Sequence, residues 1–253
     1  MDELAAAGGT IASGTPCSSL TVPGATRILV EARGLTRRDS MRGRTLLGAT
    51  DFALVAGDRV AITGPSGSGK SVFLRALALL DPVDAGQIFW HGRPVGRTAI
   101  LRFRRNVAYV RQRPAILDGT VEDNLRYPYS LRVYRDLQFD RTQAVSFATR
   151  AGRDSDFLSK RASELSGGEA QVTALVRVLQ LTPEVLLLDE PTALLDPDSS
   201  HAIEALVTAW FEATPASRAF VWVSHDPAQA ERMSERRLSM RAGVLGAAAE
   251  VYP

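Results

Sequence analysis

The sequence predicts an α/β protein with a largely parallel β-sheet covered by helices, and the main sign is a set of four short apolar segments. These are RVAIT (59–63), VAYV (107–110), VLLLD (185–189) and FVWVS (220–224). Each is mostly β-branched or aliphatic without polar alternation and is bounded by polar or turn residues, which is typical of strands buried on both faces. Such strands form parallel sheets whose two faces are covered by helices.

The other elements are expected in chain order around these strands. Residues 1–26 are rich in Ala, Gly, Ser and Thr without a helical or strand period, so we expect a flexible N-terminal extension. The folded domain is expected over 27–253, and SVFLRALALL (71–80) predicts a helix after the first core strand. The chain from about 113 to 170 lacks strong β patterning and predicts a helical lobe, after which Glu169–Gln180 has no Gly or Pro and predicts a further helix.

Composition excludes several classes of protein. The chain has 253 residues, 45% of them hydrophobic, and a net charge of +2 without a block of like charges, so nothing predicts nucleic-acid binding. A single cysteine, Cys17, excludes an internal disulfide and a cysteine-based metal site. No apolar run approaches the roughly 18 residues that cross a bilayer, and the N-terminus is acidic where a signal peptide would be basic. We therefore expect a cytoplasmic protein.

Chemically distinctive residues follow each of the four core segments. The first is followed by GPSGSGKS and the second by Gln112, the third ends at Asp189 with Glu190 next to it, and the fourth precedes His225. Ligands of open α/β sheets bind at the carboxyl ends of the strands. The four groups are therefore expected to converge on one site.

GPSGSGKS matches the phosphate-binding motif G-x-x-x-x-G-K-[ST], and it lies between a predicted strand and a predicted helix as that motif requires. In such a loop the backbone N–H groups surround a β-phosphate, the lysine reaches the β- and γ-phosphates, and the last hydroxyl ligates Mg²⁺. Only two of the 30 basic residues are lysines and one is here, which disfavours a plain Gly-rich turn. The predicted nucleotide contacts are Gly64, Pro65, Ser66, Gly67, Ser68, Gly69, Lys70 and Ser71.

The acidic pair Asp189 and Glu190 completes a catalytic hypothesis. Two carboxylates beside a phosphate loop repel each other unless a cation is present, so we expect Asp189 to hold Mg²⁺ and Glu190 to polarise the attacking water. His225 is expected to face the γ-phosphate, and Lys70 joins Glu190 and His225 as the predicted catalytic set. The competing interpretations are a solvated acidic pair at a turn and a histidine with a structural hydrogen bond.

ELSGGEAQV (164–172) places two glycines where a helix should begin. Glycine there costs roughly 0.5–1 kcal/mol each, so the segment is either a loop that precedes a helix or an anion site. Unpaired N–H groups and the helix dipole favour an anion at a helix N-terminus.

With the phosphate loop, ELSGGEAQV, VLLLDE, TALLD and SHD in this order, the chain resembles the ATP-binding subunit of ABC transporters over residues 28–240. The resemblance implies a P-loop NTPase (RecA-like) core with an antiparallel β subdomain and a helical subdomain, ATP and Mg²⁺ as cofactors, a homodimer closed by ATP and a separate transmembrane permease at the inner face of the membrane. It also implies roles. Gln112 would link nucleotide and metal to the helical lobe, Ser166, Gly167, Gly168 and Glu169 would contact the ATP of the opposite subunit, and Ala193–Asp196 would form the loop between subunits.

Finer features of the resemblance concern substrate and mechanism. The segments AILDGTVEDNLRYPYSLR, VRVLQLTPEVLLLDEPTALLD and FVWVSHD look most like the Fet-type group of iron exporters, with phosphate- and amino-acid-import ATPases as competitors. A non-transport ABC ATPase is a rival class, but its members typically carry insertions between the motifs or fused cassettes. A binding module without hydrolysis is a second rival class, and the intact catalytic residues disfavour it.

The chain also departs from the family pattern. Family members usually carry an aromatic residue that stacks on adenine about 25 positions before the phosphate loop, but GLTRRDSMRGR (34–44) has none, so the guanidinium of Arg37 or Arg38 is expected to stack instead. Val172 stands where family members commonly carry Arg. The chain ends 28 residues after His225, so no appended regulatory domain is expected.

Overall fold

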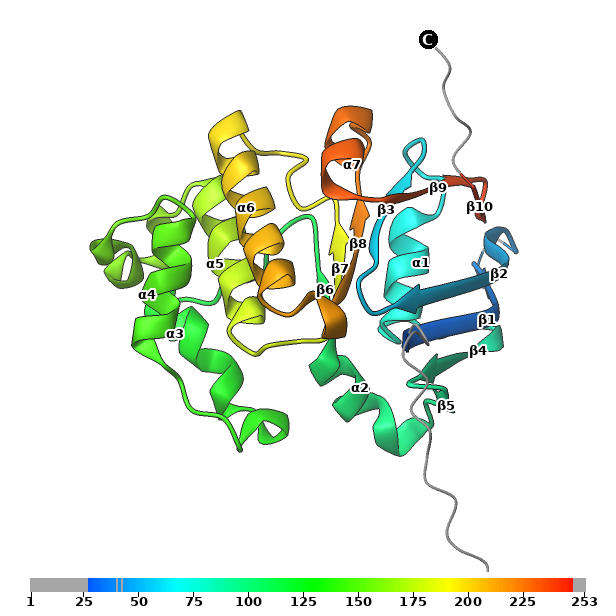
Figure 1. The fold of residues 1–253 in the computed structure, drawn as a ribbon, viewed down its shortest axis with the longest axis horizontal. Helices are drawn as coiled ribbons and strands as arrows, with labels where there is room; N and C mark the ends of the chain where they lie inside the picture. The colour runs from blue at the N-terminus through cyan, green and yellow to red at the C-terminus, as the bar shows by residue number, and fades with distance from the viewer. Residues whose placement is uncertain (1–26, 40, 42, 248–253) are drawn as a thin grey trace, which may run out of the picture.

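The computed structural model describes residues 27–39, 41 and 43–247, and these form two β-sheets with helices packed around them (Figure 1). The predicted N-terminal extension lies outside the described residues. The larger sheet has six strands in the order β10-β9-β3-β8-β7-β6, and all its pairings are parallel except β9 with β10. Its strands are β3 (Arg59–Thr63), β6 (Val107–Val110), β7 (Val185–Asp189), β8 (Ala219–Val223), β9 (Arg236–Arg241) and β10 (Val244–Ala247). The prediction of an α/β fold on a mostly parallel sheet is confirmed.

Burial on both faces explains why the core segments could be recognised. In β7, Val185 and Leu187 belong to the hydrophobic core on one side of the sheet, and Leu186 and Leu188 belong to the core on the other side. Side chains alternate between the faces of a strand, so a strand covered on both sides needs an apolar residue at every position. Every residue of β7 and β8 is buried.

The smaller sheet is antiparallel and supplies the β subdomain that the resemblance implied. Its order is β2-β1-β4-β5, with bounds β1 (Ile28–Arg38), β2 (Thr45–Val55), β4 (Ala85–Trp90) and β5 (Arg93–Pro94). Helix α1 (Lys70–Leu77) packs between the two sheets, where the rings of Phe52 and Phe73 meet edge to face at 5.4 Å. The helix predicted over 71–80 ends early, and Leu79 beyond it has φ 55°.

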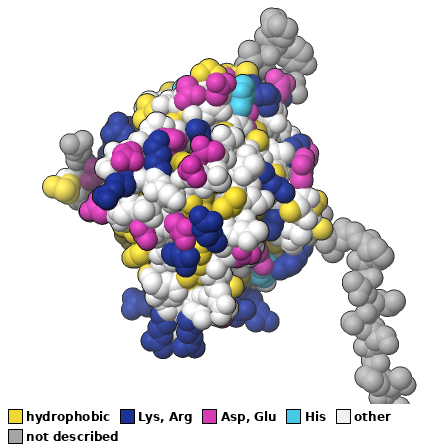
Figure 2. Space-filling view, turned by 90° about the vertical axis from the view of Figure 1, so that its left-hand side faces the viewer, with side chains coloured by type: hydrophobic (Ala, Val, Ile, Leu, Met, Phe, Trp, Pro, Cys, Tyr) yellow, Lys and Arg dark blue, Asp and Glu magenta, His cyan; other side chains and the backbone are white. Residues whose placement is uncertain are grey.

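Helices gather on the other side of the central sheet (Figure 1). They are α3 (Val121–Arg126), α4 (Arg141–Arg150), α5 (Gly167–Leu179) and α6 (Pro197–Ala213), with 3₁₀ turns at Tyr127–Ser130, Arg132–Tyr134, Ser155–Ser159 and Ala162–Glu164. Acidic and basic side chains are interspersed over this face, and arginine and lysine side chains gather at its lower edge (Figure 2).

Shorter helices complete the described chain. They are α2 (Ile100–Asn106) and α7 (Pro227–Met233), with 3₁₀ turns at Arg97–Ala99 and Pro215–Ser217. Among the described residues, no helix has the length and hydrophobicity needed to span a membrane.

Candidate functional site

The loop between β3 and α1 is shaped by glycines that no other residue can replace. Gly64 has φ 146°, and a Cβ there would lie 2.2 Å from the carbonyl oxygen of Met240. Gly69 has φ 109°, and a Cβ there would lie 2.9 Å from the carbonyl oxygen of Leu46. The loop is therefore pressed against β2 and β9, which fixes its curvature.

Lys70 lies inside this loop and is almost fully buried. Its Nζ donates hydrogen bonds to the carbonyl oxygens of Gly64 at 2.8 Å and Pro65 at 3.1 Å. The same ammonium lies 3.6 Å from Oε1 of Glu190. A buried ammonium needs such partners, since an unpaired buried charge is costly. These protein groups thus hold the lysine at the centre of the loop.

Asp189 is fixed at the end of β7 by two hydroxyl donors. Ser71 Oγ donates to its Oδ1 at 2.9 Å, and the Tyr109 hydroxyl donates to its Oδ2 at 2.7 Å. Burial raises the pKa of the Tyr109 phenol, and the hydrogen bond to Asp189 raises that pKa further, so the hydroxyl keeps its proton at neutral pH. The sequence-based reasoning included Ser71 and missed Tyr109.

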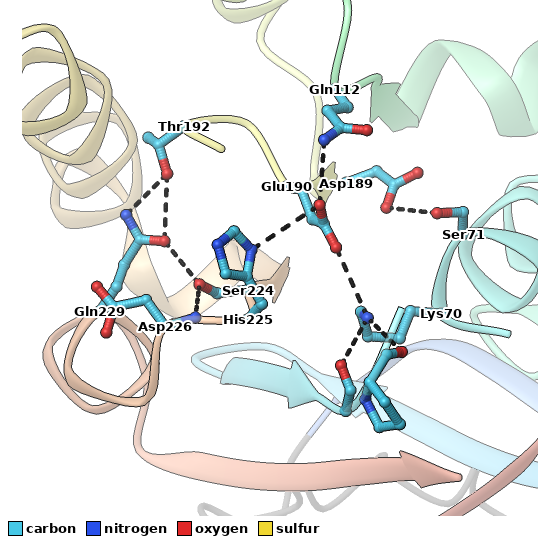
Figure 3. A network of polar contacts seen from close by, with 12 residues as sticks. Lys70, Ser71, Gln112, Asp189, Glu190, Thr192, Ser224, His225, Asp226 and Gln229 are labelled. Atoms are coloured by element: carbon cyan, nitrogen blue, oxygen red, sulfur yellow. Dashed lines mark hydrogen bonds and ion pairs between the residues drawn. The ribbon is translucent and has the colours of Figure 1, made fainter. Parts of the chain in front are cut away.

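Glu190 occupies the centre of the site (Figure 3). Gln112 Nε2 donates to its Oε2 at 3.1 Å, and His225 Nδ1 lies 4.0 Å from the same oxygen. Its backbone has φ 46°, a left-handed conformation that costs energy for a residue with a side chain. Side chains that follow β3, β6, β7 and β8 thus meet around one carboxylate. His225 is exposed, with 63% of its side chain accessible to solvent.

A buried amide network supports the segment that carries His225. Gln229 on α7 accepts hydrogen bonds from Ser224 Oγ at 2.9 Å and from Trp222 Nε1 at 3.1 Å. It donates to Thr192 Oγ1 and to Glu204 Oε1, both at 2.8 Å. The network joins the end of β8 to the segment that follows Glu190 (Figure 3). Gln229 was not expected from the sequence, because a glutamine in a short helix has no motif to mark it.

A pocket of about 430 Å³ opens between the loop, Gln112 and Glu190. The sequence predicted the phosphate-loop residues, Gln112 and Glu190 of this pocket, but not its side walls. The walls are formed by Arg44, Thr45 and Leu46 at the start of β2 and by Ala242 and Gly243 in the turn after β9. These two segments meet only in the folded chain, where Gly48 N donates to the carbonyl oxygen of Gly243.

The expectation for Arg37 and Arg38 needs correction. Arg37 forms an ion pair with Asp81, and neither arginine lines the pocket. The arginine that does line it is Arg44, from the same segment of sequence. Arg44 therefore replaces them as the candidate for contact with a nucleotide base.

The donor set fits Mg²⁺ bound together with a phosphate ligand. The hydroxyl of Ser71, the amide oxygen of Gln112 and the carboxylate of Asp189 are oxygen groups of the kind that Mg²⁺ prefers. No cluster of three or more His, Cys, Asp or Glu side chains in the described part of the chain could hold a metal ion. Mg²⁺ commonly takes only one or two carboxylates plus substrate phosphates. A site with one carboxylate, one hydroxyl and one amide oxygen therefore suits Mg²⁺ that is bound together with a phosphate.

ELSGGEAQV forms the start of α5, which begins at Gly167 and not at Glu169. Ser166 and Glu169 form a reciprocal cap, in which Glu169 N donates to Ser166 Oγ and Ser166 N donates to Glu169 Oε2 at 2.8 Å. The two glycines differ. A Cβ on Gly168 would lie 2.3 Å from Ser199 Oγ, whereas a Cβ on Gly167 would meet nothing within 4 Å.

The structure does not bring this segment to the phosphate loop of its own chain. Ser166, Gly167, Gly168 and Glu169 are absent from the lining of the pocket beside Lys70. Asp196 is absent too, and it caps α6 by accepting a hydrogen bond from Ser199 N at 2.8 Å. One chain therefore holds the residues around Lys70 in one place and the residues at the start of α5 in another.

A phosphate-binding loop with a buried lysine, an acidic pair at the end of the neighbouring strand and a parallel sheet define the class of P-loop ATPases. The family model described as ABC transporter matches residues 47–193. The chain belongs to the ABC transporter family, as an ATP-binding cassette.

Some relatives of this chain carry names that refer to different transport functions. Protein STAR1 of Oryza sativa is 39% identical over 224 residues, 88% of this chain and 62% of that protein. The probable iron export ATP-binding protein FetA of Escherichia coli is 36% identical over 181 residues, 72% of this chain and 78% of that protein. The phosphate import ATP-binding protein PstB 2 of Natronomonas pharaonis is 38% identical over 204 residues, 77% of this chain and 71% of that protein. The match thus spans less than two thirds of the length of the rice protein.

Solved structures agree on the fold. The dimeric structure of MJ0796, described as a bacterial ABC transporter cassette, superposes with a TM-score of 0.72 at 25% identity. The match covers 85% of this chain and 95% of that chain.

Proposed function

We propose that this cassette binds ATP with Mg²⁺ in the pocket beside Lys70, hydrolyses it and thereby drives a separate membrane permease. The arrangement around Glu190 carries the proposal, because a carboxylate at a strand end lies between a lysine, an amide and a histidine. In a P-loop ATPase a residue at this place orients the attacking water. The proposed domain is residues 27–253, with a helical lobe over about 113–170.

Each side chain has a proposed task in the reaction. The carboxylate of Glu190 polarises a water for in-line attack on the γ-phosphate, and His225, which lies beside that carboxylate, contacts the same phosphate. Lys70 and the loop N–H groups stabilise charge on the β- and γ-phosphates. Mg²⁺, when bound by Ser71, Gln112 and Asp189, neutralises the phosphates further. The products are ADP and inorganic phosphate.

We propose that the enzyme closes as a homodimer around two ATP molecules. Ser166 to Glu169 do not reach the phosphate loop of their own chain, and the Gly167 side of α5 has open space. N–H groups at the start of a 13-residue helix suit an anion. In the dimer, this helix start would face the ATP bound by the other subunit, with Asp196 at the junction. The dimeric cassette MJ0796 supports this arrangement.

The permease contact is proposed for the surface around α2 and α3. Exposed apolar side chains occur on α2 and on the segments before and after α3, and Arg105 of α2 donates to the carbonyl oxygen of Val133 in the 3₁₀ turn Arg132–Tyr134. They are Leu101, Leu117, Tyr127 and Leu131. A surface of this kind suits a protein partner. The cassette would then lie at the inner face of the cell membrane, in the cytoplasm.

Iron export is the proposed transport function, and phosphate import is the second candidate. The similarity to FetA over 72% of the chain supports the first, and the similarity to PstB 2 supports the second. Identification of the membrane protein that co-purifies with the chain distinguishes them, because an export permease and an import permease with a separate binding protein differ in composition.

The catalytic proposal is tested by Glu190→Gln. The variant keeps the shape of the site and loses the charge that activates water, so we expect unchanged ATP binding, at least about a 100-fold loss of phosphate release and accumulation of a dimer in ATP. Glu231→Gln, a surface carboxylate paired with Arg237, is the control and should behave as the parent. Unchanged steady-state phosphate release in Glu190→Gln would rule out the role.

A further inference from the structure

The second of the two lysines in the chain binds the segment that begins α5. Lys160 Nζ donates hydrogen bonds to both carboxylate oxygens of Glu169, at 2.9 and 2.8 Å. The pair is partly shielded, with 34% of the Lys160 side chain and 15% of the Glu169 side chain exposed. Charge-assisted hydrogen bonds that are partly shielded from water are stronger than an exposed surface ion pair.

Glu169 is fixed in position and stays ionised. It accepts a hydrogen bond from Ser166 N, and its own N–H donates to Ser166 Oγ. Burial raises the pKa of the Glu169 carboxyl, but the hydrogen bonds from Lys160 and Ser166 outweigh this effect and the pKa is lowered. A full negative charge therefore lies in the first turn of α5.

That charge conflicts with the proposed ligand. The N–H groups of the same helix turn are expected to face the triphosphate held by the opposite subunit, and a carboxylate beside them repels phosphate. Asp154 and Asp156 line the same small pocket as Lys160 and Glu169 and add negative charge. Arg153 lines that pocket as well, but Lys160 is the basic residue that bonds Glu169 among the described residues.

We propose that Lys160 is a positioning residue for ATP-driven dimerisation. It neutralises Glu169 while holding the carboxylate in its capping position, so that the start of α5 remains available to a phosphate of the opposite subunit. The inference rests on the proposed function, because it needs the helix start to meet the partner's ATP. Lys160 does not line the pocket beside Lys70, in which ATP is proposed to bind. Its loss should therefore leave ATP binding by the monomer unchanged.

The test uses the full chain in the Glu190→Gln background, in which ATP is not consumed. The monomer–dimer equilibrium is measured by analytical ultracentrifugation in saturating ATP, and binding of a fluorescent ATP analogue to the monomer is measured in parallel. Lys160→Met should weaken the ATP-driven dimer about 10-fold, the scale of a charge placed at a helix terminus. Binding of the analogue by the monomer should not change.

A double-variant cycle separates charge neutralisation from structural support. Glu169→Gln removes the repelling charge and keeps the side-chain oxygen that caps Ser166 N, so this variant is the reference for the double variant. Adding Lys160→Met to Glu169→Gln should not weaken the dimer further, since no unpaired carboxylate remains. Lys160→Arg should keep the dimer, and Arg161→Met, which removes the neighbouring exposed charge, is the matched control. Lys160→Gln is a second charge-removing variant that retains a long polar side chain.

The outcomes separate this inference from the proposed function. If Lys160→Met and Lys160→Gln both dimerise as tightly as the Glu190→Gln parent, the role of Lys160 is overturned and the proposed dimer stands. An equal weakening of the dimer by Lys160→Met with and without Glu169→Gln also overturns it, because the effect of Lys160 then does not depend on the charge of Glu169. Failure of the Glu190→Gln parent to dimerise in ATP overturns the proposed dimer and this inference with it.

Discussion

Tyr109 connects strand β6 to the acidic end of strand β7 through a single hydroxyl. Asp189 is 5% exposed and accepts hydrogen bonds from Tyr109 and Ser71. Buried carboxylates depend on such donors, because each lost hydrogen bond leaves part of a charge without compensation. The hydroxyl therefore sets both the stability of this strand end and the orientation of a proposed metal ligand.

Tyr109→Phe should lower the free energy of unfolding by about 1–3 kcal/mol, the scale of a hydrogen bond to a charged group. The ring remains in place, so no cavity forms, and the loss reports the Asp189 contact. Urea unfolding measures the change. Tyr134→Phe is the control, since its hydroxyl makes no hydrogen bond to the described residues. An equal loss in both variants would mean that Tyr109 contributes only by its ring.

Residues of the site differ in how far the sequence could predict them. Glu190, Lys70 and His225 stand in short motifs at strand ends, so residue type and position together predicted that they lie in one place. Tyr109 carries no such mark, because a tyrosine in a strand is favoured by β propensity alone. Arg44 was also missed. Its place in the pocket depends on how the start of β2 meets the turn after β9, which is a tertiary contact without a local pattern.

At the scale of elements, the two glycines of α5 have different surroundings. Gly168 is buried, and its missing side chain leaves room for Ser199 of α6. Gly167 is exposed and has free space around the position of a Cβ. The sequence predicted only that glycines there would let a phosphate approach. The contact between α5 and α6 was not predictable, since it joins segments about thirty residues apart.

Gly168→Ala should destabilise the fold, by about 1–3 kcal/mol as for other overpacking changes, and should lower the melting temperature. Gly167→Ala should leave the melting temperature unchanged or slightly higher, because Ala is the better helix former. Thermal unfolding of the two single variants makes the comparison. Ser199→Gly in the Gly168→Ala chain should recover part of the loss, and equal melting temperatures for the two alanine variants would contradict the packing role.

At the scale of the molecule, the proposed dimer accounts for two sets of residues that one chain holds apart. The pocket beside Lys70 has the groups proposed to hold the phosphates and to activate water, and the start of α5 lies elsewhere on the same chain. A C2 dimer would bring these two sets together, because a symmetric interface pairs each half of a site with its complement on the partner. Two complete sites would then form from two identical chains.

Complementation between two inactive variants tests this arrangement. Lys70→Ala lacks a working phosphate loop, and Gly167→Arg fills the open side of α5, so each homodimer should release little phosphate from ATP. In an equimolar mixture, half of the dimers would contain both variants and each would have one intact site, so about a quarter of the parent activity should return. A phosphate-release assay on the separate and mixed proteins gives the result.

Mixing Lys70→Ala with Glu190→Gln is the control and should restore nothing. Both changes fall in the same half of the site, so no site regains both the lysine of the phosphate loop and the carboxylate. Absence of recovery in the first mixture, with dimers present, would show that the two halves do not combine across subunits.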